Sequence, residues 1–106
     1  SELDRVAAVA CSGPGYAFEI ARCWIDAAIK LGFSPQTAKE LVLNTIGGSI
    51  ELAMTSEQSP EALRNSVTSK KGTTEAGLNA LTEASKLEEL FEATVQAAYQ
   101  RAVELR

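Results

Sequence analysis

The last part of the chain shows a clear pattern of hydrophobic and polar positions. Its apolar residues recur at spacings of three and four, which is the period of an amphipathic α-helix. The apolar stripe consists of Leu87, Leu90, Phe91, Thr94, Ala98, Ala102 and Leu105. The polar residues Glu88, Glu92, Gln96 and Arg101 fall outside it. No segment shows the strict alternation of a β-strand, so we expect an all-α helical bundle with helices over residues 2–10, 14–31, 35–54, 60–67, 74–84 and 86–104.

Each proline stands where one of these helices should begin, directly after a small residue. A proline at the first helical position gives up only an N–H group that would have no partner inside the helix, and a preceding serine can cap the helix. The pairs are Gly13-Pro14, Ser34-Pro35 and Ser59-Pro60. Gly32 fits the end of a helix, and residues 55–59 form a polar cluster typical of a turn.

The helix expected over residues 14–31 has an unusually wide apolar surface. Its polar residues form one narrow stripe of Glu19, Arg22, Asp26 and Lys30. Its apolar residues include Phe18, Ile20, Cys23, Trp24, Ile25, Ala28 and Ile29. A small domain cannot easily cover such a helix on all sides. Either the helix is central and surrounded by its own chain, or a second copy covers it in an intertwined dimer or larger homo-oligomer.

The pair Gly47-Gly48 lies inside the helix expected over residues 35–54. Each glycine costs a helix about 1 kcal/mol relative to alanine. The pair therefore indicates either a close helix crossing, which we favour, or a flexible hinge.

Composition excludes several classes of function. The net charge is −4, from 10 basic and 14 acidic residues, and no basic run exceeds Lys70-Lys71, so we expect no nucleic-acid partner. We find no apolar run of membrane-spanning length and no signal-peptide pattern, so we expect no membrane partner and a soluble, cytoplasmic protein. At 106 residues, the chain is expected to be one domain, residues 1–106.

The chain contains no histidine and only two cysteines. A Ser-His-Asp or Cys-His catalytic set therefore cannot be built, and a zinc site would lack its commonest nitrogen ligand, so we expect no metal. Cys11 and Cys23 do not have the spacing of a metal or redox motif. We interpret them as free, buried thiols in a reducing compartment.

The segment from Val67 to Leu78, VTSKKGTTEAGL, places a hydroxyl-rich loop directly before a helix. The first N–H groups of a helix have no internal acceptor and carry the positive end of its dipole, so an anion can bind there. Ser69, Thr73 and Thr74 would add hydroxyl donors, and Gly72 would let a ligand approach the backbone closely. Taken alone, such a loop is more often a simple connection between helices.

A second glycine-containing segment, CSGPGY, precedes the helix expected over residues 14–31. In this order, and in a helical chain of this length, the two segments resemble the C-terminal domain of pyrroline-5-carboxylate reductases. The first match consists of Ser12, Gly13, Pro14 and Tyr16, and the second of Val67, Thr68, Ser69, Gly72, Thr73 and Thr74. The resemblance covers nearly the whole chain.

The resemblance implies an enzyme of proline biosynthesis that reduces 1-pyrroline-5-carboxylate to L-proline with NAD(P)H. It also implies a dimerisation domain in which the helices of two chains interleave. Thr74 would be the catalytic residue near the imine nitrogen of the substrate. Ser69, Gly72, Thr73 and Thr74 would hold the substrate carboxylate.

The chain departs from the family pattern in two places. Lys70-Lys71 stands where the family usually has proline-glycine. Either the two lysines are a solvated loop tip, or their positive charges attract the substrate carboxylate or a cofactor phosphate. The family's N-terminal Rossmann domain is not represented in these residues, because no GxGxxG motif follows a strand. We therefore expect NAD(P)H to bind mainly in that missing domain, no cofactor in this chain alone, and no activity of the isolated chain.

Two alternatives to this interpretation stay open at this point. One is a non-catalytic helical oligomerisation module that binds no imino acid. The other is the substrate domain of another NAD(P)-dependent dehydrogenase, for which a catalytic lysine on the long helix would be expected. Lys30, near the end of that helix, is its only lysine.

Overall fold

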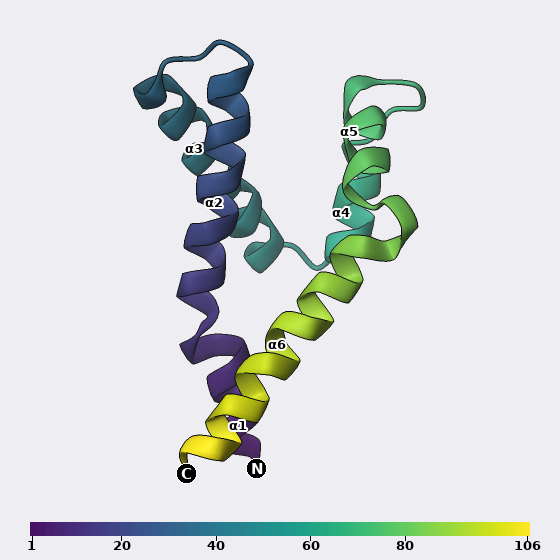
Figure 1. The fold of residues 1–106 in the computed structure, drawn as a ribbon. Coiled ribbons are helices and arrows are strands. Elements are labelled where there is room, and N and C mark those ends of the chain that lie inside the picture. Colours follow the sequence, from purple (N-terminus) through teal and green to yellow (C-terminus); the bar gives the residue numbers. More distant parts are fainter. The chain divides into compact units, whose positions relative to one another are not determined.

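The computed structural model describes residues 1–106 and consists of helices without any strand (Figure 1). The elements are α1 (Glu2–Val6), the π-helical turn η1 (Ala7–Cys11), α2 (Gly13–Lys30), α3 (Pro35–Thr55), α4 (Pro60–Ser66), α5 (Thr73–Leu81), the 3₁₀ turn η2 (Glu83–Ser85) and α6 (Lys86–Leu105). The predicted all-α fold is confirmed. The helices form two compact units, one of Ser1–Gly15 and Thr68–Arg106, the other of Tyr16–Val67. The single domain expected from the length stays a prediction.

The predicted helix starts at Pro35 and Pro60 are confirmed. The Ser34 hydroxyl accepts a hydrogen bond from the Thr37 N–H at 3.2 Å and caps α3. The Ser59 hydroxyl accepts one from the Ala62 N–H at 3.1 Å and caps α4. Each serine thus satisfies an N–H group that has no acceptor within its own helix.

The predicted end of α2 at Gly32 is also confirmed. Gly32 has a φ of +112°, a conformation that favours glycine. Its N–H donates to the Ile29 carbonyl at 2.9 Å, and the Phe33 N–H donates to the Ala28 carbonyl at 3.5 Å. These two bonds form a Schellman motif, which satisfies the last carbonyl groups of the helix.

Two predicted helices differ in detail from the structure. The helix expected over residues 2–10 is α1 followed by η1, whose wider turn is closed by a 3.0 Å bond from the Ser12 N–H to the Ala7 carbonyl. The helix expected to reach residue 84 ends at Leu81 instead. Ala84 and Ser85 adopt φ values of 54° and 58°, which reverse the helical path before α6 begins.

In the first unit, α6 packs against α1 and η1 near the two chain ends (Figure 1). Ala8 is buried there. The buried Asp4 carboxylate accepts a 3.1 Å hydrogen bond from the Ser1 hydroxyl and lies 3.0 Å from the Arg106 guanidinium.

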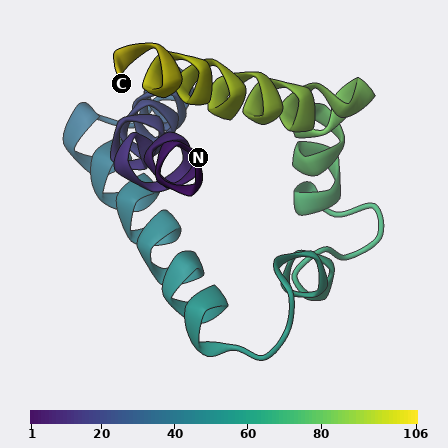
Figure 2. The ribbon, with the colours of Figure 1, turned by 90° about the horizontal axis from the view of Figure 1, so that it is seen from below.

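In the second unit, α3 leaves α2 at the loop after Leu31, and Figure 2 shows α3 running away from α2, which is seen nearly end-on. Ala38 and Val42 of α3 are buried, but α2 contains no buried residue at all. Phe18 is 74% exposed and Trp24 is 46% exposed. The alternative in which its own chain surrounds α2 is therefore wrong.

The polar stripe of α2 forms the ion-pair network that its spacing allows. Arg22 lies 2.7 Å from Glu19 and 3.0 Å from Asp26, and all three side chains are exposed. The hydrogen bonds from Arg22 hold the pKa of Glu19 below its usual value. This side of α2 faces solvent, so any partner surface lies on the apolar sides.

The pair Gly47-Gly48 lies within an unbroken α3. A Cβ atom built on either glycine meets no other group within 4 Å. The chain itself therefore provides no close helix crossing at this pair.

The two cysteines are free, as expected, but both are exposed, so their predicted burial is wrong. Cys23 lies on α2, which has no buried residue, and on η1 only Ala8 is buried, so Cys11 lies on its uncovered side. None of the helices combines the length and the hydrophobicity that crossing a bilayer requires.

Candidate functional site

The loop before α5 contains a tight turn over residues 69–72. The Gly72 N–H donates to the Ser69 carbonyl at 3.1 Å, which closes the turn. Lys71, the third residue, has a φ of 63°, and it is the only residue of the turn with a positive φ. This combination is the pattern of a type II turn, in which the third position favours glycine.

The Ser69 side chain leaves little room for a Cβ atom at the fourth position, Gly72. A Cβ atom built on Gly72 would lie 2.5 Å from the Ser69 hydroxyl oxygen and 3.3 Å from the Ser69 carbonyl oxygen. The φ of Gly72 is −88°, so the backbone conformation suits any residue, and only this contact, which the exposed Ser69 hydroxyl can relieve by rotating, favours glycine here. Sequence reasoning assigned this space to a ligand, whereas in the structure the Ser69 side chain fills it.

The start of α5 carries no side-chain cap. Gly72 is the N-cap residue, and its carbonyl accepts the first helical bond, from the Ala76 N–H at 3.2 Å. The amides of Thr73 and Thr74 come before that bond, so they have no acceptor within the helix. Thr73 and Thr74 are exposed. The helix start therefore offers backbone donors and hydroxyl groups to an anion from solvent.

Glu75 is a residue of this loop that sequence reasoning missed. Its half-buried side chain reaches back past the helix start, and its Oε1 atom accepts a 3.1 Å hydrogen bond from the Lys71 N–H. The available signal was a glutamate at the third helical position, where capping-box carboxylates bond backward to the chain before the helix.

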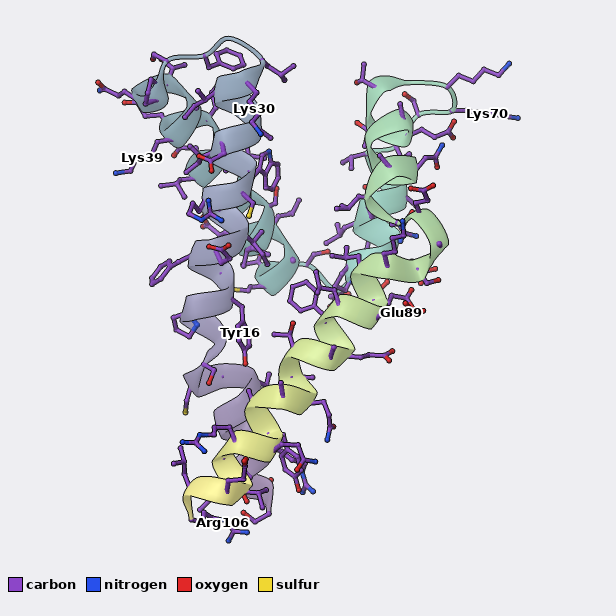
Figure 3. The ribbon with its side chains drawn as sticks, viewed as in Figure 1. Tyr16, Lys30, Lys39, Lys70, Glu89 and Arg106 are labelled. Atoms are coloured by element: carbon purple, nitrogen blue, oxygen red, sulfur yellow. The ribbon has the colours of Figure 1, made fainter.

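The structure brings all four predicted site residues into one loop and helix start: Ser69, Gly72, Thr73 and Thr74. The side chain of Lys70 points away from the helices (Figure 3). Neither Lys70 nor Lys71 takes part in an ion pair. Their two ammonium groups therefore lie beside the helix start without a direct ion pair, although the Glu75 carboxylate is bonded to the Lys71 backbone in the same loop.

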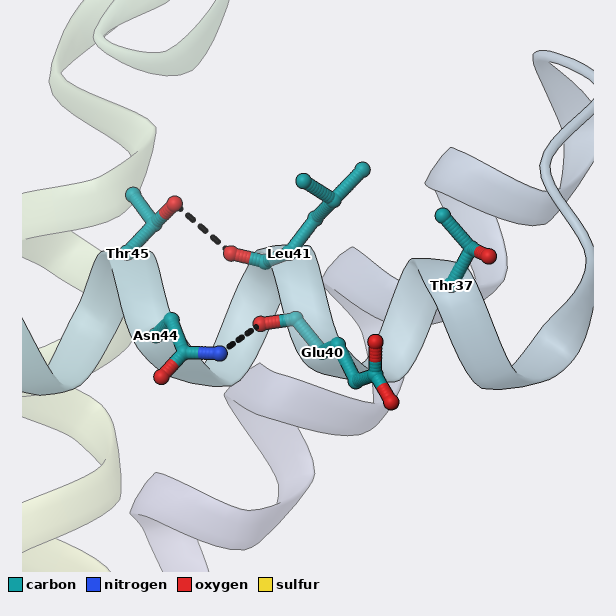
Figure 4. A pocket seen from close by; sticks show the side chains of 5 residues that line it. All are labelled: Thr37, Glu40, Leu41, Asn44 and Thr45. Carbon is teal, nitrogen blue, oxygen red and sulfur yellow. Dashed lines mark hydrogen bonds between the residues drawn. The ribbon is translucent and has the colours of Figure 1, made fainter.

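The second unit contains a hollow of about 420 Å³ on α3 (Figure 4). It is lined by Thr37, Glu40, Leu41, Asn44 and Thr45, all from the same helix. The Asn44 amide donates to the Glu40 carbonyl at 2.7 Å, and the Thr45 hydroxyl donates to the Leu41 carbonyl at 2.7 Å. Both donors are therefore bonded within α3, and the hollow is an open surface of a single helix.

A neighbouring hollow of about 280 Å³ is almost entirely apolar. It is lined by Trp24, Ala27, Ala28, Leu31, Phe33, Leu41, Val42 and Thr45. Such a surface offers no convergent polar groups that could orient a small polar substrate. It fits an apolar protein surface better.

A family model described as pyrroline-5-carboxylate reductase dimerisation matches residues 1–105 of the chain. The chain belongs to this family. A pyrroline-5-carboxylate reductase of Pseudomonas aeruginosa is 43% identical over 105 residues, which are 99% of this chain and 38% of that protein. Pyrroline-5-carboxylate reductase 2 of Bacillus subtilis is 39% identical over 104 residues, which are 98% of this chain and 37% of that protein.

Solved structures of the family have the same fold. A pyrroline-5-carboxylate reductase from Coxiella burnetii superposes with a TM-score of 0.94 at 40% identity, over 98% of this chain and 38% of that one. A Plasmodium falciparum pyrroline carboxylate reductase with NADP bound superposes with a TM-score of 0.90 at 32% identity, over 95% of this chain and 40% of that one. The chain thus spans about two fifths of these proteins, and the family decides against a domain of another dehydrogenase family.

Proposed function

We propose that this chain is the C-terminal dimerisation and substrate-binding part of a pyrroline-5-carboxylate reductase. The enzyme would reduce 1-pyrroline-5-carboxylate to L-proline with hydride from NAD(P)H. The uncapped start of α5, surrounded by the hydroxyl groups of the preceding loop, is the observation that carries the proposal. The cofactor would bind mainly in an N-terminal domain outside these residues. The Plasmodium falciparum relative with NADP bound leaves room for such a domain, because this chain covers only 40% of it.

The substrate has two groups that this loop can recognise. Its carboxylate would accept hydrogen bonds from the amides of Thr73 and Thr74 and from the Ser69 hydroxyl, at the positive end of α5. This arrangement holds the ring in one orientation. The Lys70-Lys71 pair would add long-range attraction without touching the reacting atoms.

Thr74 would act on the imine. Hydride transfer from NAD(P)H forms a C–H bond at the imine carbon, and the electron pair of the C=N bond moves to nitrogen. The nitrogen then takes a proton, which leaves proline and NAD(P)⁺. A hydroxyl that donates a hydrogen bond to this nitrogen stabilises the developing charge and orients the ring.

The Thr74→Ala variant of the longer enzyme tests this role. We expect kcat/KM for 1-pyrroline-5-carboxylate to fall by roughly 100-fold, which is typical for loss of a group that assists proton transfer. Thr74→Ser keeps the hydroxyl and should recover most of the activity. Thr82→Ala is the matched control, because the Thr82 hydroxyl at the other end of α5 bonds only to the Leu78 carbonyl.

Two results would count against the proposal in different ways. Wild-type turnover and affinity in Thr74→Ala would remove the role of Thr74. A wild-type enzyme that neither reduces the imine nor binds a proline analogue would favour the alternative of a non-catalytic oligomerisation module.

The dimer is the second part of the proposal. The only buried apolar residues of the chain are Ala8, Ala38 and Val42, whereas many large apolar side chains of α2 and α3 are exposed. A core of this size is too small to stabilise the chain. We therefore expect a second copy to cover these helices. The description of the family as a dimerisation domain supports this arrangement.

We place the protein in the cytoplasm, where the exposed Cys11 and Cys23 thiols would stay reduced.

A further inference from the structure

The turn that leads into α5 lacks the residues that usually make such a turn stable. A type II turn favours proline at its second position and glycine at its third, because the third residue has a positive φ. This chain has Lys70 and Lys71 at these positions. Lys71 nevertheless adopts a φ of 63°, a conformation that costs free energy for any residue with a Cβ atom.

The contact that offsets this cost comes from Glu75. In a type II turn, the N–H of the third residue points away from the turn and has no partner within it. Here the Glu75 carboxylate accepts a hydrogen bond from that N–H at 3.1 Å. A bond between an ionised carboxylate and a backbone amide is stronger than one between two neutral groups.

The same turn sets the position of the proposed substrate-binding groups. It is closed by the bond between Gly72 and the Ser69 carbonyl, and it places the Ser69 hydroxyl beside Gly72. Gly72 is also the N-cap of α5, so opening the turn would move both Ser69 and the first amides of the helix.

We propose that Glu75 is a positioning residue whose bond to the Lys71 amide keeps the turn over residues 69–72 closed and thereby fixes the start of α5. The closed turn follows from the structure alone. Its effect on the substrate rests on the proposed function. Glu75 itself does not touch the reacting atoms in this account.

Amide hydrogen exchange in the 106-residue protein tests the closed turn directly. Loss of one hydrogen bond in Glu75→Ala should accelerate exchange of the Lys71 amide by about fivefold and shift the NMR signals of the Thr73 and Thr74 amides. Glu75→Gln keeps an oxygen acceptor but loses the charge that strengthens the bond, so its effect should lie between those of wild type and Glu75→Ala. Glu61→Ala is the control, because it removes a first-turn carboxylate from α4 that makes no such contact.

A rescue variant separates the turn from a general loss of stability. Replacing Lys70 by proline and Lys71 by glycine gives the turn its preferred residues, so Glu75→Ala should then leave the Thr73 and Thr74 signals unchanged. The proposal is overturned if Glu75→Ala changes neither the exchange rate nor these signals. It is also overturned if the rescue variant stays as sensitive to Glu75→Ala as the wild-type protein, because Glu75 would then not act through the turn.

Kinetics in the longer enzyme test the consequence for substrate binding. Glu75→Ala should raise KM for 1-pyrroline-5-carboxylate by about fivefold with kcat nearly unchanged, because the loss concerns binding and not the chemical step. An unchanged KM would show that the turn does not position the substrate. If the wild-type enzyme fails to reduce the imine, the proposed function fails, whereas the exchange measurement still decides the role of Glu75 in the turn.

Discussion

Gly72→Ala is the most informative single change in this molecule, because α5 also contains its own control. A Cβ atom at residue 72 would come within 2.5 Å of the Ser69 hydroxyl oxygen, whereas one at Gly77 meets nothing within 4 Å. Gly72 is the N-cap of the nine-residue helix α5, and Gly77 lies within the same helix. The two substitutions add the same methyl group, so the difference between them reports the contact with Ser69 and the loss of the glycine cap, together with the gain in helix propensity at residue 77.

The magnitude follows from these two contacts. Replacing a glycine N-cap by alanine costs about 0.5–1 kcal/mol. Rotating the exposed Ser69 hydroxyl away and relaxing the backbone oxygen at 3.3 Å adds up to about 1 kcal/mol. Gly77→Ala should instead stabilise the helix by about 0.5–1 kcal/mol. We therefore expect the two variants to differ by about 1–3 kcal/mol in the free energy of opening α5.

Amide hydrogen exchange within α5 measures this difference, because a helix at the edge of the structure can open without global unfolding. In the longer enzyme, Gly72→Ala should also raise KM, since Ser69 leaves the carboxylate site. Equal protection of α5 in the two variants, together with an unchanged KM, would refute the claim that the turn and the helix start are closely packed.

Two further predictions concern the surface of the second unit. Gly47→Ala and Gly48→Ala should each stabilise α3, because alanine favours a helix more than glycine does. Each should also weaken self-association if α3 crosses a helix of a second copy closely at this pair. A dimer dissociation constant equal to that of the wild type would exclude such a crossing. Arg22→Gln should raise the pKa of Glu19 toward its usual value, as an NMR titration of its carboxyl group can show. Because the pKa of Glu19 is lowered in the folded protein, the stabilisation by Arg22 is present at neutral pH and is lost as the pH falls through that pKa, so the two proteins should become equally stable in acid.

The sequence predicts most helix boundaries because they depend on local chemistry. Ser34 and Ser59 cap their helices, and Gly32 ends α2, through bonds that involve only neighbouring residues. The π-helical turn η1 and the early end of α5 were missed. Ala84 and Ser85 are compatible with a helix, so nothing in the local sequence announces their positive φ values.

The candidate site was predictable in its residues but not in its packing. Ser69, Gly72, Thr73 and Thr74 are close in sequence, so any helix that begins here brings them together. That Ser69 fills the space beside Gly72, and that Glu75 bonds to Lys71, depends on the conformation of a turn whose residues do not favour it. The sequence shows that the wide apolar surface of α2 has to be buried against something. It does not show that the rest of the chain leaves every residue of α2 at least partly exposed.

Sedimentation equilibrium of the 106-residue protein at micromolar concentration shows whether the fold needs a second copy. With so few buried apolar residues in one copy, we expect a helical species with twice the 11.3 kDa mass of one chain, which loses its helical circular dichroism as it dissociates on dilution. A stably folded, helical monomer would contradict the claim that a second copy completes the structure.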